Sequence, residues 1–84
     1  MQYIYPKLKK VKAEPDFTLL LEYKNGEKRK YNASNLLKKG IFKTLQKFES
    51  FKKVKLSDHG DTVCWGDELD IAPESLYEKS ISLA

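Results

Sequence analysis

The clearest strand pattern in the chain runs from Asp16 to Tyr23, where large apolar residues recur at every second position. Side chains two residues apart share one face of a strand, so this spacing predicts a strand with one buried face. Leu20 is the single large apolar residue on the opposite face. The positions on the face that we expect to be buried are Phe17, Leu19, Leu21 and Tyr23.

A hairpin turn follows this strand. Asn25 and Gly26 tolerate the positive φ that tight hairpin turns need. A two-residue loop would pair Leu19 with Asn32, whereas a three-residue loop over residues 24–26, with Gly26 as a bulge, pairs Leu19 with Tyr31. Only the longer loop brings this tyrosine onto the apolar face, and we therefore predict it, with a return strand over residues 27–31.

The other elements are shorter. Alternation predicts a strand over residues 8–13, which Pro15 ends. A short helix is expected over residues 32–39, with Asn32 or Ser34 as its cap and Gly40 as its stop. Helical spacing then predicts one or two turns packed on the sheet. The apolar positions that carry this spacing are Ile41, Phe42, Leu45, Phe48, Phe51 and Val54.

The last third of the chain predicts short strands and one helix. Strands are expected over residues 54–57, 62–65 and 68–71, with a turn over residues 58–61 between the first two. Pro73 can open a helix with Leu76, Tyr77 and Ile81 on its packed side, and the last three residues are expected to fray.

Together, these elements predict an α+β fold: a small antiparallel sheet built from hairpins, with short helices packed on one face. The 84 residues are enough for one domain, and we expect residues 1–84 to form it, with an ordered core over about residues 8–80.

Charge divides the chain in two. Residues 1–55 hold fifteen Lys and Arg against five Asp and Glu, a net +10, whereas residues 56–84 hold one Lys against seven acids, a net −6. The folded domain therefore either has one basic face and one acidic face or neutralises these charges internally, and both arrangements stay open. Cys64 is the single cysteine, which argues against a disulfide framework and fits a cytoplasmic protein. Apolar runs are too short for a membrane span or a secretory signal.

Residues 38–55 alternate lysines with phenylalanines. Cations can contact phosphates, and exposed aromatic rings can stack on bases, so this stretch is a candidate for nucleic-acid binding. The helical spacing of the phenylalanines instead predicts that they are buried, which leaves an ordinary amphipathic segment or phosphate contact alone. The lysines concerned are Lys38, Lys39, Lys43, Lys47, Lys52, Lys53 and Lys55.

One cluster has residues suited to catalysis or metal binding. His59 lies between Asp58 and Asp61, and Cys64 follows shortly after. A nucleophilic site would need His59 close to Cys64 and donors for an oxyanion. The same Asp, His and Gly mixture is typical of tight turns, and Cys64 between Val63 and Trp65 suggests a small apolar filler. We therefore expect no enzyme, no metal site and no cofactor.

Two further features concern partners. The acidic residues near the C-terminal end could dock a basic partner or could neutralise the chain's own lysines. Trp65 could anchor an interface, but burial in the core is the average state of tryptophan and is what we expect. The acidic residues proposed for partner binding are Asp67, Glu68, Asp70 and Glu74, with Glu78 beyond them.

An ordered set of residues, spread from about Leu8 to Glu78, resembles a bacterial family of proteins of unknown function, the one numbered 2442. Two positions depart from the usual family pattern: Asn32, where members commonly have Asp, and Gly66, where Pro often follows the Trp. The matching segments are Leu19-x-Leu21-x-Tyr23-x-Asn25-Gly26-Glu27-x-Arg29-x-Tyr31, Leu36-Leu37-x-x-Gly40-Ile41-Phe42-x-x-Leu45, Phe51-x-x-Val54, Val63-x-Trp65 and Asp70-x-x-Pro73-x-x-Leu76-Tyr77.

The resemblance implies a small cytoplasmic α+β domain that stands alone or precedes a helical DNA-binding-like segment. Many members are encoded beside another small protein, which implies a partner-binding or antitoxin-like role, and the family supplies no catalytic residues. We therefore expect a non-enzymatic protein-interaction module with a protein partner or a second copy of itself. Nucleic-acid binding through residues 38–55 is the alternative.

Overall fold

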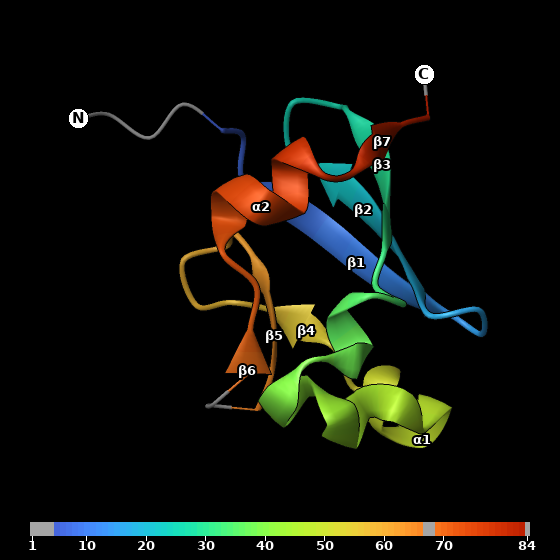
Figure 1. Ribbon diagram of the computed structural model, residues 1–84. Coiled ribbons are helices and arrows are strands. Elements are labelled where there is room, and N and C mark those ends of the chain that lie inside the picture. The colour runs from blue at the N-terminus through green and yellow to red at the C-terminus, as the bar shows by residue number, and fades with distance from the viewer. Residues whose placement is uncertain (1–4, 67–68, 84) are drawn as a thin grey trace.

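The predicted hairpin forms the centre of a four-stranded antiparallel sheet. The computed structural model describes residues 5–66 and 69–83. Within them, β1 (Leu8–Glu14), β2 (Thr18–Tyr23), β3 (Lys28–Asn32) and β7 (Ile81–Ser82) lie in the order β1-β2-β3-β7 (Figure 1). The α+β prediction is confirmed by this sheet and the short helices described below.

The register of the hairpin is the one that the three-residue loop predicts. Leu19 lies opposite Tyr31, and the backbone N–H of Tyr23 donates to the carbonyl of Glu27. Gly26 has a φ of +92°, which residues with a Cβ rarely adopt. The preceding strand starts at Thr18 rather than Asp16, because Phe17 lies in the turn with a φ of +64°.

The expected strands of the last third form a second sheet instead of extending the first. In the described residues, β4 (Lys55–Leu56), β5 (Val63–Trp65) and β6 (Leu69–Asp70) pair in that order. The predicted antiparallel strands are confirmed, and they are divided between two sheets. The turn between β4 and β5 links the second sheet to the first, because the carbonyl of Gly60 accepts a 2.7 Å hydrogen bond from the backbone N–H of Leu8 at the start of β1.

The helical segments are tighter and shorter than predicted. Two 3-10 helices, η1 (Leu36–Lys38) and η2 (Gly40–Gln46), precede α1 (Phe48–Phe51). Asn32 does not cap a helix, because its side-chain oxygen accepts from the backbone N–H of Ser34 and closes a local turn. Extended backbone at Lys39 and Lys47 interrupts the helical run. The side chain of Ile41 lies outside the described part.

The core lies between the two sheets. Trp65 is buried, as predicted, and its indole N–H donates to the carbonyl of Phe51 at 2.8 Å. Phe51 is fully buried, and its ring centroid lies 5.8 Å from that of Trp65. The face of β2 that was expected to be buried contributes to the same core through Leu19, Leu21 and Tyr23.

The last helix, α2 (Pro73–Glu78), begins at the predicted proline but ends before Ile81. Leu76 is fully buried, whereas Ile81 is 69% exposed, so its predicted place on the packed side is wrong. Ile81 lies in β7 opposite Lys30, and the backbone N–H of Leu83 donates to the carbonyl of Lys28. Residues 82 and 83 are therefore paired rather than frayed, and Ala84 lies outside the described residues.

Candidate functional site

One face of the four-stranded sheet is turned away from α2, the second sheet and the helical segments, which all lie on the other side (Figure 1). Residues opposite each other in antiparallel strands share a face, so the exposed side chains form rows across the sheet. We call this surface the outer face. One row contains Lys12, Leu20, Lys30 and Ile81; the next contains Lys10, Glu22, Lys28 and, just beyond β7, Leu83.

The outer face combines apolar groups with hollows. Ile81 and Leu83 are 69% and 52% exposed, and they are the large hydrophobic residues that the described part of the chain exposes. A hollow of about 410 Å³ lies between β1, β2 and Leu83, and another of about 280 Å³ lies toward the β1–β2 turn. Leu20 lines both hollows, so it separates two adjacent depressions on this face.

The charge of the outer face is positive. Within the two rows, lysines at positions 10, 12, 28 and 30 stand against Glu22. Toward the β1–β2 turn the acidic residues Glu14 and Asp16 line the second hollow, so the positive charge is concentrated in the two rows. The carboxylate of Glu22 also forms an ion pair, because the ammonium group of Lys9 lies 3.4 Å from it. Sequence reasoning missed this surface, although alternate lysines in the strands, on the side opposite the buried residues, are the signal that could have found it.

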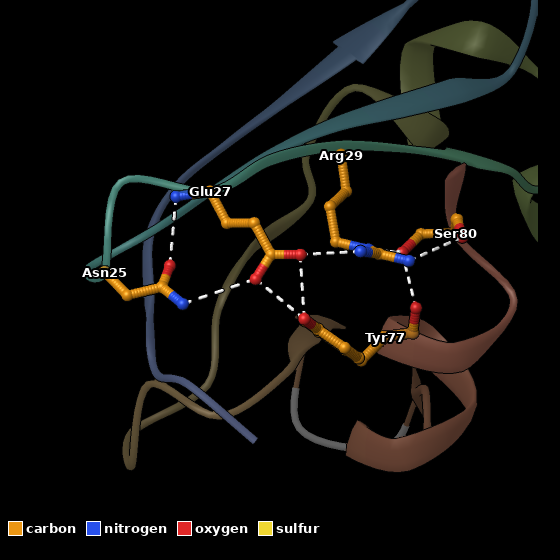
Figure 2. Close-up of polar contacts among 5 residues, drawn as sticks. All are labelled: Asn25, Glu27, Arg29, Tyr77 and Ser80. Carbon is orange, nitrogen blue, oxygen red and sulfur yellow. Dashed lines mark hydrogen bonds and ion pairs between the residues drawn. The ribbon is translucent and has the colours of Figure 1, made fainter. Parts of the chain in front are cut away.

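The densest polar network joins the hairpin to the end of α2 (Figure 2). Arg29 donates to the carboxylate of Glu27 at 2.6 Å and to the Ser80 carbonyl at 2.9 Å, and Tyr77 donates to Glu27 at 2.7 Å. The guanidinium of Arg29 also lies 4.2 Å from the centroid of the Tyr77 ring. Sequence reasoning missed this network as well. The signal was present, because Glu27 and Arg29 are charged residues on the strand face that Tyr31 shares.

These contacts shift two pKa values in opposite directions. The hydrogen bond from Tyr77, followed by that from Arg29, lowers the pKa of Glu27 below its usual 4.5. The same hydrogen bond to Glu27, together with burial, raises the pKa of Tyr77 above its usual 10.0. The network therefore favours a carboxylate at Glu27 and a neutral phenol at Tyr77. Its groups are engaged with one another, and the arrangement fastens α2 to the hairpin.

The residues that sequence reasoning considered for catalysis meet only in part. Asp58, His59 and Cys64 line an open hollow of about 280 Å³ beside the second sheet. Asp61 instead accepts a 3.0 Å hydrogen bond from the Ser57 hydroxyl. Cys64 is half-buried rather than a core filler, because its neighbours on β5 take the inward positions. Across the described ranges, the structure brings together no group of three His, Cys, Asp or Glu residues that could hold a metal ion.

The lysines of residues 38–55 are all exposed and are distributed over η1, η2, β4 and the segments between the elements. Lys52 forms a 3.2 Å ion pair with Glu49. The phenylalanines of this stretch pack on the core, as their spacing predicts: Phe51 is buried, and Phe42 and Phe48 are half-buried. This region therefore offers ammonium groups rather than open aromatic faces.

The acidic candidates do not form a described cluster. Asp70 lies on β6 and Glu74 in the first turn of α2, and both are exposed. Asp67 and Glu68 lie outside the described residues. Glu78, at the end of α2, accepts a hydrogen bond from the hydroxyl of Tyr5.

Fold and site together define a small α+β domain with a basic, partly apolar open sheet face. The family model described as "Protein of unknown function (DUF2442)" matches residues 8–82, and the chain belongs to that family. No curated protein and no solved structure matches the chain significantly. None of the helices in the described residues has the length and apolar content needed to cross a bilayer.

Proposed function

We propose that this protein is a non-enzymatic interaction module that binds a protein partner through the outer face. The observation that carries this proposal is the exposure of Ile81 and Leu83 beside the hollows around Leu20, on a sheet face that no other element of residues 5–66 and 69–83 covers. Apolar groups rimmed by charged residues are typical of protein-binding surfaces.

The resemblance to the family indicates which kind of partner we propose. The partner is a second small protein in the bacterial cytoplasm, encoded beside this one, in an antitoxin-like pairing. The polar groups of Glu27, Arg29 and Tyr77 bind one another and hold α2 to the hairpin. Because these groups are already engaged, the network supports a binding role over a catalytic one. The exposed Asp70 and Glu74 offer a secondary, acidic docking position.

Site-specific photo-cross-linking in the native host tests the proposal. A photoreactive amino acid at Ile81 should yield one discrete adduct with a single protein. The matched control places the same amino acid at Glu49, whose side chain is 83% exposed on the other side of the molecule's core, and it should yield none. The absence of a discrete adduct at Ile81, or equal adducts at both positions, contradicts an interaction through the outer face.

Nucleic-acid binding is retained as a second candidate because all seven lysines of residues 38–55 are exposed. Titration with duplex and single-stranded DNA at several salt concentrations tests it. Binding that neutralises Z phosphates should give a slope of about −0.9Z on duplex when log K is plotted against log salt. Reversal of Lys43 and Lys53 to glutamate should reduce that slope. Weak binding that does not respond to salt would exclude this function.

A further inference from the structure

The arrangement of charges and hollows on the outer face points to the chemistry of its partner. This inference rests on the proposed interaction role of that face. We infer that the outer face receives an acidic amphipathic α-helix of the partner protein, lying along the strands, with apolar side chains on either side of Leu20 and carboxylates above the flanking lysines.

The spacing of the lysines matches the width of a helix. Lys10 and Lys12 lie on β1, and Lys28 and Lys30 lie on β3, with β2 between them. Neighbouring strands are about 4.8 Å apart, so the two lysine columns are separated by about 9.6 Å at the backbone. A helix with its side chains is about 10 Å across. Acidic residues on both flanks of one helix can therefore reach ammonium groups on both columns.

The hollows supply places for the apolar side of that helix. One hollow extends from Leu20 toward Glu22, and the other extends from Leu20 toward Thr18, where Glu14 and Asp16 also line it, so an apolar rather than an acidic side chain suits that end. The two hollows therefore follow one another along β2. Successive turns of a helix are about 5.4 Å apart, so residues at positions i and i+4 can place one apolar side chain on each side of Leu20. The exposed side chains of Ile81 and Leu83 extend this apolar contact at the β7 edge.

Charge complementarity favours an acidic helix over a second copy of the protein as the occupant of the outer face. Two outer faces brought together symmetrically would place lysines against lysines, and like charges across an interface oppose binding. Glu22 does not offset this repulsion, because Lys9 already pairs with its carboxylate, and Glu14 and Asp16 lie toward the β1–β2 turn, outside the two rows that hold the lysines. An acidic helix meets the same lysines with opposite charge.

The shape of the surface favours a helix over an anionic bilayer as the binding partner. Lipid-binding surfaces insert protruding apolar side chains below the headgroups. On the outer face the exposed Ile81 and Leu83 lie at the β7 edge, whereas the centre of the face has depressions on both sides of Leu20, with volumes of about 410 and 280 Å³. Depressions of this kind accept side chains from a partner, as in the recognition of amphipathic helices by grooves.

The experiment measures binding of synthetic helical peptides to the intact protein by fluorescence anisotropy. The probes are 16-residue Glu- and Ala-rich peptides with leucines at i and i+4 or at i and i+3, a scrambled peptide of the same composition, and a version with Lys in place of Glu. We expect saturable binding of a patterned acidic peptide, and amide NMR shifts centred on Lys12, Leu20 and Lys30. The scrambled and basic peptides should bind more weakly or not at all.

Two double variants with equal net charge supply the control. Lys12→Glu with Lys30→Glu should weaken binding of the patterned peptide by about tenfold or more, because favourable pairs become like-charge pairs. Lys43→Glu with Lys53→Glu changes the net charge equally but lies off the outer face, and it should leave affinity unchanged. All four positions are exposed, so both variants should fold, which circular dichroism verifies.

Each contrary result has a distinct meaning. Equal weakening by the two double variants, or equal binding of the scrambled peptide, overturns the inference in favour of non-specific attraction. Binding of phosphatidylserine vesicles without binding of any peptide assigns the face to a membrane. Self-association in sedimentation that is lost with Lys12→Glu and Lys30→Glu assigns it to a second copy. A protein adduct at Ile81 without peptide binding leaves the proposed function standing and rejects only the acidic helix.

Discussion

The hydroxyl of Tyr77 lies 2.7 Å from each carboxylate oxygen of Glu27, a residue fifty positions earlier in the chain. The Arg29 guanidinium lies 2.6 Å from the same carboxylate and also binds Ser80, just after α2. Two segments that are distant in sequence are thus joined by contacts to one carboxylate. The charge state of Glu27 should therefore affect the stability of the whole fold.

Acid should weaken this connection. Folding lowers the pKa of Glu27, so its stabilising contribution is complete above its unfolded pKa of about 4.5 and is lost as the pH falls through the lower, folded pKa. The drop in unfolding free energy between about pH 6 and pH 3 should be smaller in Glu27→Gln than in the wild type. Urea unfolding at both pH values measures the difference.

The control for this prediction is Glu49→Gln, because Glu49 is 83% exposed and its pairing with Lys52 is a surface contact. That variant should retain the wild-type dependence on pH. At neutral pH, Glu27→Gln itself should cost about 1 to 3 kcal/mol, since it weakens hydrogen bonds to a charged acceptor. An unchanged acid response in Glu27→Gln would show that the contacts to Tyr77 and Arg29 carry little stability.

The turn of the central hairpin provides a second prediction. Gly26 has a φ of +92°, and nothing lies within 4 Å of the place that a Cβ would occupy. Gly26→Ala should therefore destabilise the protein through backbone strain alone, by about 1 to 2 kcal/mol. Gly26→Asn should cost less, because asparagine visits the left-handed region more readily. Thermal unfolding of both variants measures this order, and equal stability of all three proteins would contradict it.

The hairpin was predictable because its constraints are local. The alternation of Leu19 and Leu21, the Asn25-Gly26 pair and the need to bury Tyr31 together leave one register. The core position of Trp65 was predictable for a similar reason, because burial is the average state of that residue. Each of these conclusions needed only residues close together in the sequence and a general preference for burying large apolar groups.

The division into two sheets was not predictable, because it depends on contacts between distant segments. The bond from Leu8 to Gly60 joins residues from the first strand and a late turn, and no local pattern encodes it. The same limit applies to Arg29, whose partner Ser80 lies fifty-one positions away. The outer face was missed because its lysines come from two strands and become one surface only when β2 separates β1 from β3.

Trp65 provides a third prediction. Its indole N–H donates to the Phe51 carbonyl, which also accepts from the backbone N–H of Val54. In Trp65→Phe that carbonyl keeps one partner, so the loss is one buried hydrogen bond and the space left by a smaller ring. We expect a cost of about 1 to 3 kcal/mol in urea unfolding followed by far-ultraviolet circular dichroism. A cost below about 0.5 kcal/mol would mean that the core around Phe51 repacks freely.

Leu76 and Ile81 provide the sharpest contrast between sequence pattern and structure, because helical spacing placed both on one packed side. Leu76 is a fully buried residue of α2, whereas Ile81 is 69% exposed on the outer face. Leu76→Ala should therefore cost about 2 to 5 kcal/mol, and Ile81→Ala should change stability by about 0.5 kcal/mol or less. Chemical unfolding of the two variants, each truncating one aliphatic side chain, gives a direct comparison. Similar losses at the two positions would place Ile81 in the core and remove the exposed apolar edge on which partner binding depends.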